Sequence, residues 1–204
     1  MFNICNLRMS CKRFQIFRNN KMKENRVISI KSNPDYLIIK TSGEVDFIDH
    51  YQLRSDKLNY APEPKDLMIA FFKAFPASFK LLLNLRESIA RLLKLKTSPQ
   101  SEKASRLDKL HRFKGDIGDQ ITLFEVLNKS DKELLTGQKD SHLDFKLSFI
   151  TYQINDSISL EMVTVVNINN TIGKVYFGIV KPIHKWYMKK ILKNMERELV
   201  NKMW

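Results

Sequence analysis

His142 and Asp144 are a histidine and a carboxylate two residues apart, a spacing that could support acid–base chemistry. Residues two apart on a β-strand point to the same side, and a carboxylate beside an imidazole can raise its basicity. The same parity carries Lys146 and Ser148, whereas the opposite parity is apolar. We therefore expect His142 and Asp144 on the outer face or rim of a one-sided sheet. We favour a polar network that fixes strand register for these two residues, with a ligand-binding or catalytic role as the alternative.

The other histidines give little sign of a metal or a cofactor. His50, His111 and His184 are far apart and form no paired spacing such as His-x3-His, so we expect no metal site. His50 alternates with apolar residues of a predicted strand and is expected to be exposed. His184 lies among lysines, which should lower its pKa and keep the ring neutral. No glycine-rich phosphate loop and no Gly-x-Ser-x-Gly motif occurs, and we expect no cofactor.

Apolar side chains give a second kind of candidate site. Ligand pockets are mostly apolar with a few polar anchors, although simple filling of a core accounts for most such residues. Arg86 lies on an otherwise apolar helical stripe, and it either anchors a ligand or pairs with a carboxylate such as Asp144. The expected ligand-binding residues are Phe71, Phe75, Leu82, Arg86, Phe124, Phe149, Tyr152, Tyr176 and Ile179.

The elements that would position these residues follow from hydrophobic period and turn signals. Residues 27–30 and 36–40 are β-prone patches around an Asn-Pro turn. Pro76 separates two predicted helices, and residues 97–114 form a polar, mobile loop. The turn Asn155-Asp156 joins two long alternating strands, which is a strong hairpin signal. The predicted strands are 46–53, 121–127, 133–139, 142–154 and 157–167, and the predicted helices are 64–75, 77–95 and 171–203.

The C-terminal segment decides the fold class. Its apolar residues, from Ile172 through Ile179 and Trp186 to Leu199, advance at helical spacing. Pro182 lies inside this predicted helix and should kink it. The alternative is a further strand over residues 175–180, with a helix only after Pro182. A sheet with one apolar face needs a cover. We predict an α+β helix-grip fold, in which a curved antiparallel sheet wraps around a long C-terminal helix and two shorter helices follow the first strand.

Composition and charge describe an ordinary globular chain with basic ends. The 204 residues are 43% hydrophobic and 28% charged, with a net charge of +13. Residues 1–24 and 174–204 carry most of the excess, so the body is nearly neutral and no nucleic-acid partner is expected. Cys5 and Cys11 form no disulfide framework, and no signal peptide or membrane span is evident. We expect a cytoplasmic protein with a flexible extension over 1–24, a single domain over 25–204 and no integral membrane association.

Two segments resemble the pattern of a known family. Residues Gly137 to Lys146 are similar to its signature Gly-x-x-Asp-x-His-Leu-Asp-Phe-Arg, with Lys146 in place of the usual arginine. Ile172-Gly173-Lys174, followed by Pro182 and His184, resembles its C-terminal pattern. The family is a bacterial domain of unknown function, grouped with the polyketide cyclase/START-like (SRPBCC, birch-allergen-like) superfamily and sometimes found behind short-chain-dehydrogenase-like domains. The resemblance covers about residues 44–203 and implies a helix-grip fold with an apolar cavity.

The function expected from these observations is the binding of a small hydrophobic or amphipathic molecule between the sheet and the C-terminal helix. A fold alone does not define a reaction. A cyclase, dehydratase or isomerase that uses the same cavity is one alternative. A peripheral module that binds anionic lipid or nucleic acid through the basic termini is another. A homodimer is left open.

Overall fold

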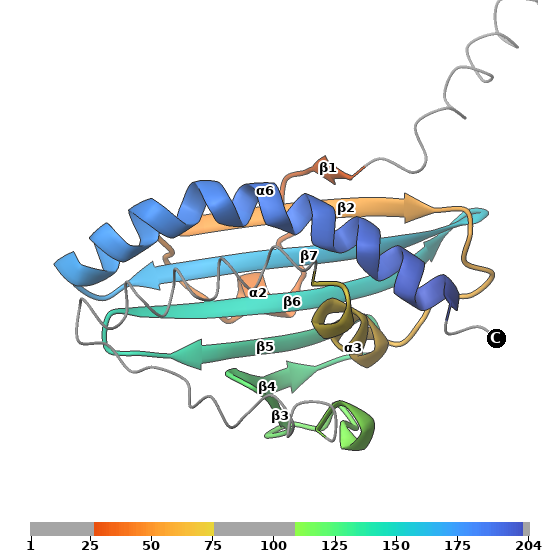
Figure 1. Ribbon diagram of the computed structural model, residues 1–204, viewed down its shortest axis with the longest axis horizontal. Coiled ribbons are helices and arrows are strands. Elements are labelled where there is room, and N and C mark those ends of the chain that lie inside the picture. The colour runs from red at the N-terminus through yellow and green to blue at the C-terminus, as the bar shows by residue number, and fades with distance from the viewer. Residues whose placement is uncertain (1–26, 76–108, 202–204) are drawn as a thin grey trace, which may run out of the picture.

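The computed structural model describes residues 27–75 and 109–201, and every statement below concerns these residues. They form one antiparallel sheet with helices on both of its faces (Figure 1). In chain order the elements are β1 (Ile28–Ser29), α2 (Leu37–Lys40), β2 (Phe47–Ser55), α3 (Pro64–Lys73), β3 (Gln120–Ile121), β4 (Phe124–Lys129), β5 (Glu133–Lys139), β6 (Leu143–Ile154), β7 (Ser157–Ile168) and α6 (Thr171–Asn201).

The sheet has seven strands in the order β1-β2-β7-β6-β5-β4-β3, and all neighbouring pairs are antiparallel. Its centre is the predicted hairpin of β6 and β7, each 12 residues long, with Ile154 opposite Ser157. Asn155 at the turn has φ of 50°, a left-handed conformation that asparagine tolerates. Strand β2, which corresponds to the strand predicted over residues 46–53, pairs with β7 along its whole length. The predicted α+β class, antiparallel sheet and terminal helix are confirmed.

Helices α3 and α6 cover one face of the sheet (Figure 1). Helix α6 runs across β2 and β7, and α3 packs against α6 and β6. The side chains between them include Leu67, Phe71, Phe149, Met162 and Met195, all at most 4% exposed. The terminal helix runs for 31 residues through Pro182, so the alternative of a further strand before this proline is wrong.

A second, smaller core lies on the opposite face of the sheet. Adjacent residues on a strand point to opposite faces, and Leu134 belongs to the main core whereas Leu135 belongs to the second one. The second core also contains Ile38 of the short helix α2 and Ile150 of β6. The central strands are therefore covered on both sides, which departs from the one-sided sheet expected from their alternation.

Three local predictions are wrong. Residues 36–40 were expected to be β-prone, but Leu37–Lys40 form helix α2. The single strand expected over 121–127 is divided into β3 and β4 by a tight turn in which Thr122 has φ of 53°. Ile179, expected to bind a ligand between the sheet and the C-terminal helix, is 43% exposed. The predicted helix over 77–95, most of the loop over 97–114 and the N-terminal extension over 1–24 lie outside the described residues.

Candidate functional site

The motif segment around His142 lies where the turn between β5 and β6 meets the start of α6. Asn170 caps the helix, because its side-chain oxygen accepts a hydrogen bond of 3.0 Å from the backbone N–H of Gly173. The Asn170 amide nitrogen donates to the Ser141 carbonyl at 3.0 Å. A Cβ atom on Gly173 would overlap the carbonyl oxygen of His142, so only glycine fits at this contact. The two motif segments thus meet in one joint.

His142 and Asp144 have different surroundings in this joint. The His142 ring is 6% exposed and lies edge-on to Tyr176 of α6, with 5.1 Å between ring centroids. Its Nδ1 lies 3.5 Å from Oδ1 of Asp140, so this carboxylate is beside the ring. Asp144 instead accepts hydrogen bonds from the Asp140 backbone N–H and the Asn169 side chain, at 3.1 and 3.2 Å. These contacts give Asp144 a structural task, and a catalytic role for the pair stays a prediction.

Four of the predicted ligand-binding residues come together on the helix-covered face. Phe71 of α3 makes edge-to-face contacts with Phe75, Phe124 and Phe149, with centroid separations of 4.9, 5.9 and 5.3 Å. Edge-to-face packing is a favoured arrangement of aromatic rings. We call the following set the aromatic group: Phe71, Phe72, Phe75, Phe124, Phe145 and Phe149.

The aromatic group reaches from the core to the surface. Phe71 and Phe149 are at most 4% exposed, whereas Phe75, Phe124 and Phe145 are only partly buried. It therefore presents partly accessible aromatic surface between α3 and the strands β4 and β6.

The other predicted ligand-binding residues lie elsewhere. Tyr176 is in a separate apolar cluster with Phe47 and Phe177. Ile179 is on the solvent side of α6, and Tyr152 is on the sheet face away from α6, where its hydroxyl donates to Glu161. Leu82 and Arg86 lie outside the described residues.

Buried polar groups lie beneath α6, on the same face as the aromatic group. Asp49 is 8% exposed and accepts a hydrogen bond of 2.7 Å from the Tyr51 hydroxyl. His184 contacts the ring of Phe47 edge-on, and its Nε2 is buried and has no hydrogen-bond partner in the described part of the chain. Burial lowers the pKa of His184 to about 4, although the charge of Asp49 opposes this and Lys185 adds to it. The expected neutral ring is therefore confirmed, with burial rather than the lysines as its main cause.

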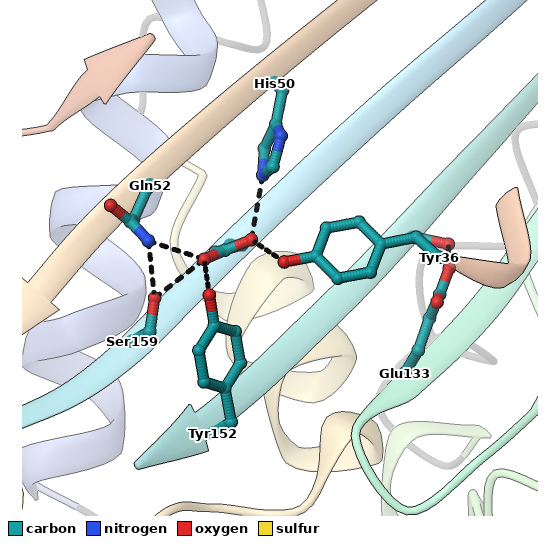
Figure 2. Close-up of polar contacts among 8 residues, drawn as sticks. Tyr36, His50, Gln52, Glu133, Tyr152 and Ser159 are labelled. Atoms are coloured by element: carbon teal, nitrogen blue, oxygen red, sulfur yellow. Dashed lines mark hydrogen bonds and ion pairs between the residues drawn. The ribbon is translucent and has the colours of Figure 1, made fainter. Parts of the chain in front are cut away.

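A carboxylate network on the opposite sheet face was not predicted. Glu161 of β7 is fully buried, and Figure 2 shows the donors that surround it. Oε2 accepts from His50 Nε2 at 2.9 Å and from the Tyr36 hydroxyl at 2.7 Å. Oε1 accepts from Gln52, the Tyr152 hydroxyl and Ser159, at 2.6, 2.7 and 2.8 Å. The carboxylate network consists of Tyr36, His50, Gln52, Tyr152, Ser159 and Glu161.

The network holds Glu161 as an anion. Burial opposes its ionisation, but the hydrogen bonds from His50, Tyr36, Tyr152 and Ser159 outweigh burial and lower the pKa of Glu161 to about 2. Burial and the hydrogen bond to Glu161 raise the pKa of the Tyr36 phenol well above its usual range. A saturated anion of this kind exchanges no proton near neutral pH. The role of Glu161 is therefore to position the side chains that donate to it.

A second buried glutamate completes the attachment of α2. Glu133 of β5 is 3% exposed and accepts hydrogen bonds from the backbone N–H groups of Leu37 and Ile38, at 2.6 and 3.0 Å. Ser148 donates to the same carboxylate at 2.6 Å. These two N–H groups open helix α2 and have no partner inside it. Glu133 therefore caps the helix from a distant strand (Figure 2).

His50 was expected to be exposed, and this is wrong, since it is 2% exposed within the network. The expectation assumed that only the parity of Phe47 and Tyr51 faces a core. One sequence signal could have indicated otherwise. Glu161 lies between Leu160 and Met162 and shares its parity with Val163 and Val165, and a charge among such residues needs buried partners.

Within 27–75 and 109–201, no three His, Cys, Asp or Glu side chains are grouped so that they could hold a metal ion. In the same ranges, none of the helices combines the length and apolar composition needed to cross a bilayer.

Comparison with known proteins places the chain in a family. The family model described as "Protein of unknown function (DUF2867)" matches residues 41–191, which is more than half of the sequence. The chain therefore belongs to this family. The match includes both motif segments up to His184. No curated protein and no solved structure matches the chain.

Proposed function

Starting from this family membership, we propose that the chain is a helix-grip protein of the START-like kind that binds a small apolar or amphipathic molecule between the sheet and helices α3 and α6. The aromatic group is the observation that carries the proposal. Its inner members pack in the core, while Phe75, Phe124 and Phe145 keep part of their surface accessible. Binding sites for small apolar molecules are lined mainly by such side chains.

The buried polar groups beneath α6 support an amphipathic rather than a purely apolar ligand. The Nε2 atom of His184 lacks a partner in the described ranges, and an unsatisfied buried polar atom is costly. A hydroxyl or carbonyl group of a bound molecule could satisfy it. Asp49 lies on the same sheet face, where its charge acts on His184. The proposal concerns binding alone, since these contacts require no chemical step.

The test is a titration with a fluorescent fatty acid, 11-(dansylamino)undecanoic acid, whose emission rises in an apolar site. We expect saturable binding to the full chain. Phe124→Ala should weaken it about tenfold, because burial of an aromatic side chain against a ligand contributes about 1–2 kcal/mol. Tyr152→Phe is the control, because Tyr152 lies on the opposite face. Phe75→Leu provides a milder change if Phe124→Ala fails to fold.

Two results would overturn the proposal. One is the absence of saturable binding to the folded chain. The other is an affinity that Phe124→Ala and Phe75→Leu both leave unchanged while circular dichroism shows that they fold. Native mass spectrometry of protein purified under mild conditions is a second measurement, and we expect it to reveal a retained lipid-like molecule.

A further inference from the structure

The solvent side of α6 carries a row of apolar side chains. Ile172, Val175, Ile179 and Trp186 are 40%, 54%, 43% and 60% exposed. Their spacings of three, four and seven residues place them along one side of a helix. They are four of the nine large hydrophobic residues exposed in the described ranges, and the other five are scattered over other elements. We call these four residues the exposed row.

Lysines accompany the exposed row along the helix. Between Thr171 and Met195 the sequence contains six lysines and no acidic residue. The six are Lys174, Lys181, Lys185, Lys189, Lys190 and Lys193, and all of them are exposed. The first acidic residue of α6 is Glu196, which is 4% exposed and bonded to Ser55 and Lys57. The exposed side of α6 before Glu196 therefore carries charge of one sign.

Cation–π contacts direct three of these lysines toward β2 and one toward the exposed row. Lys181 and Lys185 place their Nζ atoms 5.1 and 5.8 Å from the centroid of Phe47 on β2. Lys189 lies 5.8 Å from the ring of Tyr51 on the same strand. Lys190 lies 5.4 Å from the Trp186 ring, within the row itself. The helix thus presents an apolar band with positive charge along its length.

We propose that the exposed side of α6 docks on the surface of an anionic lipid bilayer. A helix that lies in a membrane interface combines an apolar face with lysines and often with tryptophan, which favours the headgroup region. Anionic headgroups attract lysines near the surface. The exposed row and the lysines of α6 supply both parts of this pattern. In this arrangement α6 would lie on the membrane surface and would not cross the bilayer. The inference is independent of the proposed ligand.

Two other partners fit the surface less well. A nucleic acid would engage the lysines through its phosphates, but it would leave the exposed row without a role. A second copy of the chain, packed through the same face, would bring two sets of lysines together, and α6 offers no acidic residue before Glu196 to pair them. The combination of apolar band and single-sign charge is what selects a lipid surface.

The experiment measures co-sedimentation of the full chain with phosphatidylcholine vesicles, with and without phosphatidylglycerol. We expect binding only to the vesicles that contain phosphatidylglycerol. Ile179→Ser should reduce it at least about fivefold, because an apolar side chain leaves the interface. Ile48→Ser is a matched control, since Ile48 on β2 is also 43% exposed but lies outside α6. This variant should bind like the parent.

A second pair of variants tests the charge. Lys190→Gln combined with Lys193→Gln should weaken binding about tenfold or more, because each lysine near an anionic surface contributes about 1 kcal/mol. Lys132→Gln combined with Lys139→Gln makes the same change in net charge on β5 and the turn before it, and should have little effect. In a Trp204→Phe background, Trp186 emission should shift to the blue when vesicles are added.

Four results would overturn the inference. The first is a failure of the chain to bind anionic vesicles. The second is equal binding after Ile179→Ser, which would assign binding to another segment. The third is a dimer, seen by sedimentation equilibrium, that Ile179→Ser dissociates while vesicle binding is absent. The fourth is binding to a double-stranded RNA that the lysine variants reduce while vesicle binding is absent, which would identify the surface as a nucleic-acid site.

Discussion

Single residues on the side of the sheet away from α6 act by fixing structure. Glu161 accepts hydrogen bonds from five side chains that come from β2, β6, β7 and the turn before α2. Removing one partner of a buried charge costs more than the pair contributes, because the remaining groups lose both water and partner. The network therefore ties the turn before α2 to the Glu161 carboxylate, through the Tyr36 hydroxyl.

Replacing Glu161 with glutamine should destabilise the protein by about 3 kcal/mol, because the donors around it lose the anion they surround. Urea unfolding at neutral pH measures the effect. Tyr152→Phe removes a single hydrogen bond and should cost about 1 kcal/mol. An unfolding free energy of Glu161→Gln equal to that of the parent would show that the network contributes little.

His184 should make the protein sensitive to mild acid. Its pKa is about 4 in the folded chain, against 6.5 for the free side chain, so the unfolded chain binds the proton more tightly. Stability should be full above about pH 6.5 and fall as the pH approaches 4, by about 3 kcal/mol at most. Urea unfolding across this range measures it, and His184→Gln should flatten the dependence. An unchanged slope in that variant would assign the effect to other groups.

At the scale of elements, the joint between the β5–β6 turn and α6 determines where the long helix begins. Asn170 caps the helix and also holds the Ser141 carbonyl. The backbone N–H of Asn169 donates to the His142 carbonyl at 3.0 Å, beside Gly173. The motif residues therefore fix the start of α6, while β2 and β7 lie beneath its length.

Two glycines of α6 give a matched test of this joint. Gly173→Ala should destabilise the protein by about 2 kcal/mol or more, because its Cβ would overlap the His142 carbonyl oxygen. Gly178 has no atom within 4 Å of an added Cβ, so Gly178→Ala should stabilise the helix by up to about 1 kcal/mol. Thermal melts of both variants measure the difference. Equal melting temperatures would mean that the helix start can move without cost.

At the scale of the whole molecule, local sequence patterns predicted the elements but not the second core. Strand alternation and a two-residue turn were enough to predict β6 and β7. Helical spacing after Pro64 was enough to predict α3. By contrast, α2 exists because Glu133, nearly a hundred residues later in the chain, accepts from its first N–H groups. No window of local sequence contains that interaction.

The candidate site was predicted only in part, because local patterns do not show which distant segments meet. The phenylalanines of the aromatic group lie on faces that helical spacing and strand alternation predict, so their meeting could be expected from the sequence. His50 was misplaced because a sheet covered on both sides has no exposed parity at its centre. Tyr152 was misplaced because it shares the strand parity of Asp144, which points away from α6. The position of Ile179 was wrong because α6 has apolar residues on two sides, and spacing alone does not say which side meets the sheet.

The pairing of β2 with β7 has a consequence for how the chain folds during synthesis. Phe47 lies opposite Val166, so the earliest long strand finds its neighbour only after more than a hundred further residues have been made. Until then the edge of β2 that pairs with β7 has no native partner, and contacts so distant in sequence form slowly. This part of the sheet can therefore assemble only after β7 has been synthesised. We expect the nascent chain to be prone to aggregation during this interval, because an unpaired strand edge can pair with other chains.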